Sequence, residues 1–209
     1  MNTKSESPLI RTILILTLIA ICAALRLAPH PWNFTPIGAM AIFAGAMIRN
    51  RPWAFLFPLL AMFATDLIIG FNVLSPLVYA SFSFSVLISR SHASRRDVDG
   101  ARLGAAQSER SERVPNPNEP RDWRWAGTIA RLGAATFLGS LQFFLVTNFG
   151  VWAFLDTYPR TAAGLAACYL AGLPLFLNTL TGDFTYMALL LGALALAMAV
   201  VQPRASVST

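Results

Sequence analysis

The sequence predicts an all-α fold: a polytopic membrane helical bundle of six transmembrane helices with one additional broken or re-entrant segment. Hydrophobic residues make up 56% of the 209-residue chain and charged residues only 12%, whereas a soluble domain carries about 25% charged residues. Several apolar runs also approach or reach the roughly 20 residues that cross a hydrocarbon core about 30 Å thick. We therefore expect residues 1–209 to form a single integral membrane domain.

The charged residues gather in one stretch, residues 90–131, which holds six of the ten acidic and nine of the sixteen basic residues. Within it, the segment VPNPNEP cannot hold a regular helix, because each proline removes a backbone donor and disfavours helix at the residue before it. We expect residues 91–125 to form a disordered, Arg-rich cytoplasmic loop. The net charge of +6 then indicates cytoplasmic loops and no nucleic-acid binding.

The apolar runs predict the helices in order. Residues 10–27 form the first helix, which we interpret as uncleaved although the basic residues before it resemble those of a signal peptide. The second run, residues 36–48, is short and rich in Gly and Ala. Four further helices are expected, over residues 53–71, 74–89, 127–146 and 184–201.

Residues 161–180 decide the number of crossings. The basic residues before the first helix, around residue 50 and in the Arg-rich loop all fall on one side if the N-terminus is cytoplasmic. Six crossings keep Arg204 on that side, and seven do not. Because the run contains Gly164, Gly172 and Pro174, we expect it to be broken or re-entrant over a cavity, where irregular backbone is allowed at membrane depth. Seven transmembrane helices are the alternative.

This topology gathers polar and aromatic residues on the outer side, in PHPWNFTP, FNVLSP and TNFGVWAFLDTYP. Two acids lie at membrane depth, where an unpaired carboxylate costs several kcal/mol and is a functional-site candidate, and Arg26 is placed to pair with the first of them. We expect an outward cavity with aromatic walls and polar groups that fix a ligand. Its predicted ligand-binding residues are Trp32, Asn33, Phe34, Asp66, Asn72, Asn148, Trp152, Asn178, Asp183 and Tyr186.

These residues also have structural interpretations. The aromatic residues can form the belt found at membrane interfaces, and Asp66 and Arg26 can be a structural pair. The asparagines can cap helices or connect them. Because the candidates converge on one side, we favour a binding site.

Motifs of several enzyme classes are missing from the sequence. There is no GxxxxGK[ST] phosphate loop, no HExxH motif or Cys/His cluster and no nucleophile motif. We expect no enzyme activity, no cofactor and no metal site, and we interpret Cys22 and Cys168 as packing residues. A membrane enzyme that acts on a lipid head group, with Asp66 and His30 as acid and base, is a lesser alternative.

Four stretches carry a resemblance: LRLAPHPWNFTPIGAMAIFAGA, FPLLAMFATDLIIGF, TNFGVWAFLDTYPRTAAGL and CYLAGLPLFLNTLTGDFTY. They resemble a family of uncharacterised bacterial integral membrane proteins. The resemblance covers the chain except its tail and the Arg-rich loop. The loop is longer and more charged than we expect for the family, which suggests a lineage-specific insertion there. The family has no established activity to carry over.

The layout is also distantly similar to the substrate-binding S components of energy-coupling factor (ECF) transporters. The similarity lies in the order of a short Gly/Ala helix, an Asp-bearing helix and a Gly-Leu-Pro segment before the last helix. It implies both termini in the cytoplasm, capture of a vitamin or micronutrient, and a membrane-embedded coupling subunit with two ATPases. Ala20 and Ala24 resemble the small-residue surface by which such components dock, although such residues also pack inside bundles.

We therefore expect a multi-pass protein of the bacterial inner membrane that binds or transports a small molecule. Its expected partners are the lipid bilayer and a coupling subunit with ATPase subunits. The alternative function is a structural or assembly scaffold of a membrane complex, which would act through its small-residue faces and the Arg-rich loop.

Overall fold

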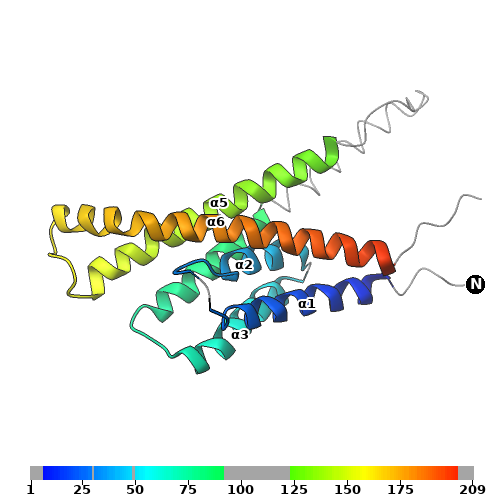
Figure 1. Cartoon of the computed structure of the whole chain (residues 1–209), viewed down its shortest axis with the longest axis horizontal. Coiled ribbons are helices and arrows are strands. Elements are labelled where there is room, and N and C mark those ends of the chain that lie inside the picture. Colours follow the sequence, from blue (N-terminus) through cyan, green and yellow to red (C-terminus); the bar gives the residue numbers. More distant parts are fainter. Residues whose placement is uncertain (1–6, 30, 49, 92–122, 202–209) are drawn as a thin grey trace, which may run out of the picture.

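The computed structural model describes residues 7–29, 31–48, 50–91 and 123–201, and these residues form helices joined by short turns. The helices pack as a bundle (Figure 1), which confirms the predicted all-α class. In chain order they are α1 (Ser7–Leu25), α2 (Ile37–Met47), α3 (Arg51–Ile69), a helix over residues 75–91, α5 (Trp123–Phe154) and α6 (Ala162–Val201).

Among the described residues, three helices are long and apolar enough to cross a membrane: α3, residues Gly127–Phe154 of α5 and residues Ala162–Ala197 of α6. Two shorter apolar helical stretches, Thr12–Leu25 and Ile37–Met47, accompany them. Large apolar side chains such as those of Leu67 and Ile68 face outward. Because lipid tails solvate such side chains, these features indicate a membrane-associated protein.

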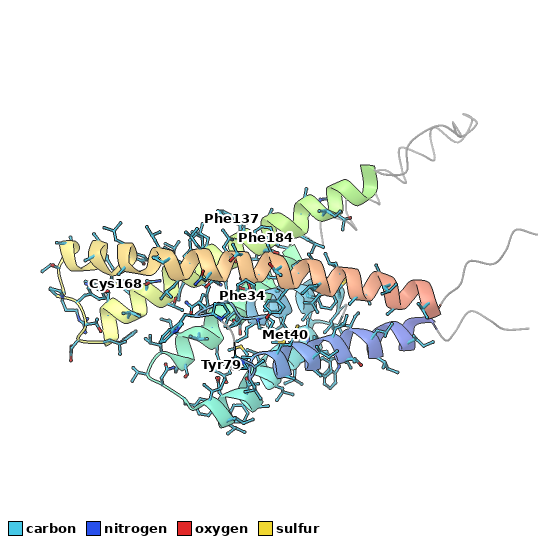
Figure 2. The ribbon with its side chains drawn as sticks, in the orientation of Figure 1. Phe34, Met40, Tyr79, Phe137, Cys168 and Phe184 are labelled. Carbon is cyan, nitrogen blue, oxygen red and sulfur yellow. The ribbon has the colours of Figure 1, made fainter. Side chains whose placement is uncertain are left out.

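Helix α2 lies at the centre of the bundle, where α1, α3, α5 and α6 all contact it. It has 11 residues, or about 16 Å at 1.5 Å per residue, roughly half the thickness of a hydrocarbon core. Its side chains from Ala39 to Gly45 are all buried, and Met40 accordingly lies in the middle of the molecule in Figure 2. A helix that is apolar on every side is buried on every side.

Proline and glycine set the ends of α2 and α3. Pro36 precedes the first residue of α2, and Pro52 lies in the first turn of α3, where a missing N–H breaks no intrahelical bond. Helix α3 ends at Gly70, whose φ of 102° disfavours any residue with a side chain. The Gly70 N–H donates to the carbonyl oxygen of Asp66 at 2.8 Å and closes the last turn.

Helices α5 and α6 form a long hairpin that extends past the other helices at its loop end (Figure 1). They have 32 and 40 residues, or about 48 and 60 Å. The prediction of a broken or re-entrant segment over residues 161–180 is therefore wrong, because that run and residues 184–201 belong to one continuous helix.

The reason α6 stays continuous lies in its packing against α5. Pro174 removes one intrahelical hydrogen bond, but contacts with α5 hold the helix on both sides of it. The Phe176 ring packs against Phe144 of α5, with ring centroids 4.9 Å apart, and Gly172 lies directly against the side chain of Asn148. The short helix of this bundle is α2, with 11 residues.

The predicted disordered loop is also bounded differently. Ser91 is the last described residue of the helix over 75–91, and α5 begins at Trp123, so both ends of the predicted range 91–125 are helical. Residues 92–122 lie outside the described residues.

Candidate functional site

The loop between α1 and α2 is fixed to the middle of α6. The side-chain amide of Asn178 donates to the carbonyl oxygen of Trp32 at 3.1 Å. The ring of Phe34 packs against Tyr186, with centroids 5.7 Å apart, and Gly182 leaves room for the Phe34 backbone. Asn178, Phe34 and Tyr186, three of the predicted ligand-binding residues, therefore hold the loop in place.

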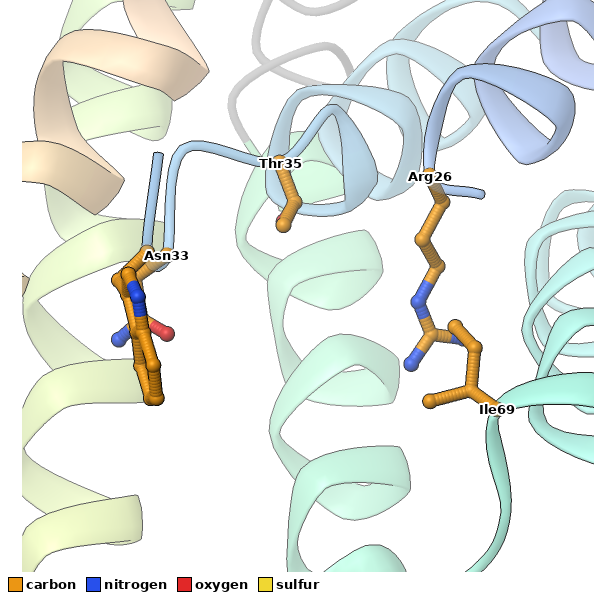
Figure 3. A pocket seen from close by; sticks show the side chains of 5 residues that line it. Arg26, Asn33, Thr35 and Ile69 are labelled. Atoms are coloured by element: carbon orange, nitrogen blue, oxygen red, sulfur yellow. The ribbon is translucent and has the colours of Figure 1, made fainter. Parts of the chain in front are cut away.

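This loop forms one wall of a cavity that is widely open to the surroundings and has a volume of about 360 Å³, near the lower end of the roughly 300–1,000 Å³ typical of small-molecule sites. Figure 3 shows Asn33 on one side and Arg26 with Ile69 on the other, with Thr35 between them. Asn33 has a φ of 61°, a left-handed conformation that Asn tolerates better than most residues. The cavity is lined by Arg26, Trp32, Asn33, Thr35 and Ile69.

A buried ion pair stands behind the cavity. Nη2 of Arg26 lies 2.7 Å from Oδ1 of Asp66, which confirms the proposed pairing. The hydroxyl of Tyr79 donates to the other carboxylate oxygen at 2.7 Å. Asp66 is only 5% exposed, and such a pair is tolerated only when its remaining polar atoms are also bonded. The carboxylate of Asp66 thus holds Arg26 and does not itself line the cavity.

Asp183 caps the N-terminus of α2 from another helix. Its Oδ1 accepts the backbone N–H of Ala39 at 2.9 Å, and its Oδ2 accepts the hydroxyl of Ser140 at 2.7 Å. The first amides of a helix lack intrahelical partners and carry partial positive charge, so a carboxylate suits this place. Gly38 approaches so closely that an added Cβ would lie 2.6 Å from Cγ of Asp183. With 3% exposure, Asp183 is part of the core.

Three predicted residues lie in other parts of the molecule. The side chain of Asn72 accepts the N–H two residues further on, at 2.8 Å, and makes an Asx turn before the helix over 75–91. The amide of Asn148 donates to a carbonyl of its own helix at 2.9 Å. The indole N–H of Trp152 donates to the carbonyl of Pro159 at 2.9 Å, across the α5–α6 loop. The ten predicted residues therefore do not form one site.

Sequence reasoning missed a seam of buried hydroxyl groups beside Asp183. Gln142 donates to the carbonyl of Ser81 and to the hydroxyl of Ser85, both at 2.9 Å, and Ser89 donates to the carbonyl of Ile42 at 2.6 Å. Small hydroxyl residues let helices approach closely and bond to backbone carbonyls. The available signal was a spacing of four residues on each of two helices, the helix over 75–91 and α5. The seam comprises Ser81, Ser85, Ser89, Thr136 and Ser140.

Comparison with known protein families gives a match for this chain. Residues 6–205 match the model of a family described as "Family of unknown function (DUF6580)". The chain belongs to this family. No curated protein and no solved structure matches the chain. The expected membership of an uncharacterised family is thus confirmed, while nothing in these comparisons links the DUF6580 chain to ECF S components.

Two other expectations concern catalysis and metals. In the described part of this DUF6580 chain, no group of three or more His, Cys, Asp or Glu side chains is placed to hold a metal ion. His30, the base of the enzyme alternative, lies outside the described residues.

Proposed function

We propose that the protein binds a small molecule, of the vitamin or micronutrient class, at the outer side of the bacterial inner membrane as part of its transport. The observation that carries this proposal is the cavity beside the α1–α2 loop. It combines the exposed indole of Trp32 with a guanidinium, an amide and a hydroxyl group. Small-molecule sites have this character: apolar or aromatic walls with a few polar groups that fix orientation.

The proposed topology has six crossings with both termini in the cytoplasm, and the α1–α2 loop together with the short helix α2 makes the second crossing. The start of α1, the start of α5 and the end of α6 lie toward one end of the molecule (Figure 1). The Arg-rich stretch joins the helix over 75–91 to α5, and basic loops favour the cytoplasm. Arg26 follows the far end of α1 and Ile69 ends α3, which supports an outward-facing cavity.

A separate membrane partner belongs to the proposal, because the chain has no phosphate-binding loop of its own. Ala20 and Ala24 are both exposed on α1, whereas Ala41 and Gly45 are buried. An added Cβ at Gly45 would lie 2.7 Å from the carbonyl oxygen of Val86. The pair on α2 therefore packs inside the bundle, and the pair on α1 is free to approach another helix, as in a coupling subunit.

The proposed function is tested by the composition of the growth medium. A strain without the gene is complemented with the wild type, with Ile69→Trp, which fills the cavity, or with Ile68→Trp, its exposed neighbour outside the cavity lining. We expect at least one medium component to be depleted by the wild type and by Ile68→Trp, but not by Ile69→Trp or the strain without the gene. Equal depletion by all four strains would contradict a transport function.

The exposed pair on α1 also fits the alternative of an assembly scaffold, and the Arg-rich loop separates the two functions. Deletion of residues 92–122 should abolish a scaffold function and leave uptake intact. If this deletion removes a membrane complex and leaves uptake of the medium component unchanged, the scaffold function is favoured.

A further inference from the structure

The charge distribution around the cavity defines a ligand class. We infer that the cavity takes a planar molecule whose edge carries hydrogen-bond acceptors and which has no cationic group. This inference rests on the proposed function, since it concerns the same cavity. It follows from three features. Arg26 has N–H groups that no described residue uses, neither Asp66 nor Asp183 lines the cavity, and the indole of Trp32 is exposed beside it.

Arg26 keeps donors available for a ligand. Its guanidinium has five N–H groups. Nη1 donates to Thr65 Oγ1 and to the carbonyl oxygen of Met62, and Nη2 is paired with Asp66. These contacts with described residues leave Nε–H and the second Nη2–H, on a side chain that lines the cavity. Two N–H groups in a fixed plane suit a carbonyl, a carboxylate or a ring nitrogen.

Neither buried acid offers an acceptor to the cavity. Asp66 uses Oδ1 for Arg26 and Oδ2 for Tyr79. Asp183 uses its two oxygens for Ala39 and Ser140 in the core. No carboxylate is among the described residues that line the cavity. A cationic amine would therefore meet a guanidinium without a facing counter-charge, while Asp66 compensates the charge of Arg26 enough for a neutral or singly anionic ligand.

Trp32 supplies the apolar contact. Trp32 is 83% exposed, and its carbonyl oxygen accepts a hydrogen bond from Asn178. The indole is therefore not packed against the protein and can contact a ligand. An exposed aromatic face on an anchored backbone favours a planar partner, because stacked rings gain free energy beyond that of their buried area. An indole alone also attracts cations, and for that reason the charge of the ligand needs a direct test.

The test uses three aromatic probes of matched size: benzamide, benzoate and benzylamine. Binding to the full-length protein in lipid nanodiscs is measured by saturation-transfer NMR, and the signal from empty nanodiscs is subtracted. We expect benzamide and benzoate to bind at least tenfold more tightly than benzylamine. Ile69→Trp should remove this binding, and Ile68→Trp should retain it.

A charge change at the cavity wall sharpens the test. Asn33→Asp keeps the side-chain shape and tolerates the left-handed backbone, but adds a carboxylate. It should weaken benzoate at least tenfold and strengthen benzylamine. The control Asn72→Asp, in another exposed turn that Asp also stabilises, should change neither. Benzylamine binding as tightly as benzamide in the wild type would overturn the ligand class and leave the proposed function standing. No binding sensitive to Ile69→Trp for any probe would overturn both.

Discussion

The close approach of Gly38 to Asp183 gives the sharpest stability prediction. A methyl group in Gly38→Ala would lie closer to both carboxylate oxygens of Asp183 than its 2.6 Å from Cγ, where ordinary contacts begin at 3.4 Å, so the carboxylate must retreat by about an ångström or more. That movement breaks its hydrogen bond to Ala39. Loss of a charge-assisted bond costs about 1.5–3 kcal/mol and overpacking about 1–3 kcal/mol. We expect a total loss of about 3–5 kcal/mol.

The assay uses the two buried free cysteines, Cys22 and Cys168, which react with a fluorogenic maleimide as the protein unfolds on heating. At about 2–4 °C per kcal/mol for a chain of this length, Gly38→Ala should lower the melting temperature by about 10 °C. The control Gly192→Ala, on α6 with no atom within 4 Å of the added Cβ, should leave it unchanged or raise it slightly.

The same substitution in the Asp183→Ala variant separates the clash with the carboxylate from a general effect of the added methyl group. In Asp183→Ala the space of the carboxylate is free, so adding Gly38→Ala should cost less than it does in the wild type, by more than about 1 kcal/mol. An equal cost in both backgrounds, or a wild-type melting temperature for Gly38→Ala, would refute the reasoning.

Three further predictions concern the ion pair, the partner face and the core. Asp66→Asn should cost less than the roughly 3–5 kcal/mol typical of a fully buried pair, because it leaves the partly buried guanidinium of Arg26 without its counter-charge, and the double variant Arg26→Met with Asp66→Leu should lose less still in the same thermal assay. Ala20→Leu with Ala24→Leu should leave the melting temperature unchanged and abolish co-purification of membrane partners, while the control Ile13→Leu, also at an exposed position of α1, should leave both the melting temperature and the co-purification unchanged. Gly45→Ala should reduce the amount of folded protein in the membrane, because its Cβ meets backbone of the neighbouring helix; a wild-type amount would show that the two helices can separate without cost.

The helical class and the pairing of Arg26 with Asp66 followed from composition and depth, because membrane insertion restricts backbone and charge so strongly. The continuity of α6 did not follow. The glycine and proline content of residues 161–180 reports only the local conformational preference of the backbone. Whether the helix bends there is decided by its packing along α5. The sequence also marked the second run as short, but not as the central helix.

The candidate site was predicted in part. The α1–α2 loop, which the sequence predicts as part of the site, lines the cavity through Trp32 and Asn33. Thr35 and Ile69 carry no chemical signal in sequence, and their place in the lining depends on how α3 packs beside the loop. Asn148 and Trp152 looked equivalent to the loop residues because the topology predicted from the sequence put both groups on the outer side. The length of the α5–α6 hairpin separates them, and that length is a tertiary property.

The central claim, that the cavity beside Trp32 holds a small molecule, is tested most directly by native mass spectrometry of the protein released from its own membrane. The account predicts a non-lipid adduct of constant mass on the wild type and on Ile68→Trp, absent from Ile69→Trp. A wild-type protein that carries only lipid, or an adduct that persists in Ile69→Trp, would contradict it.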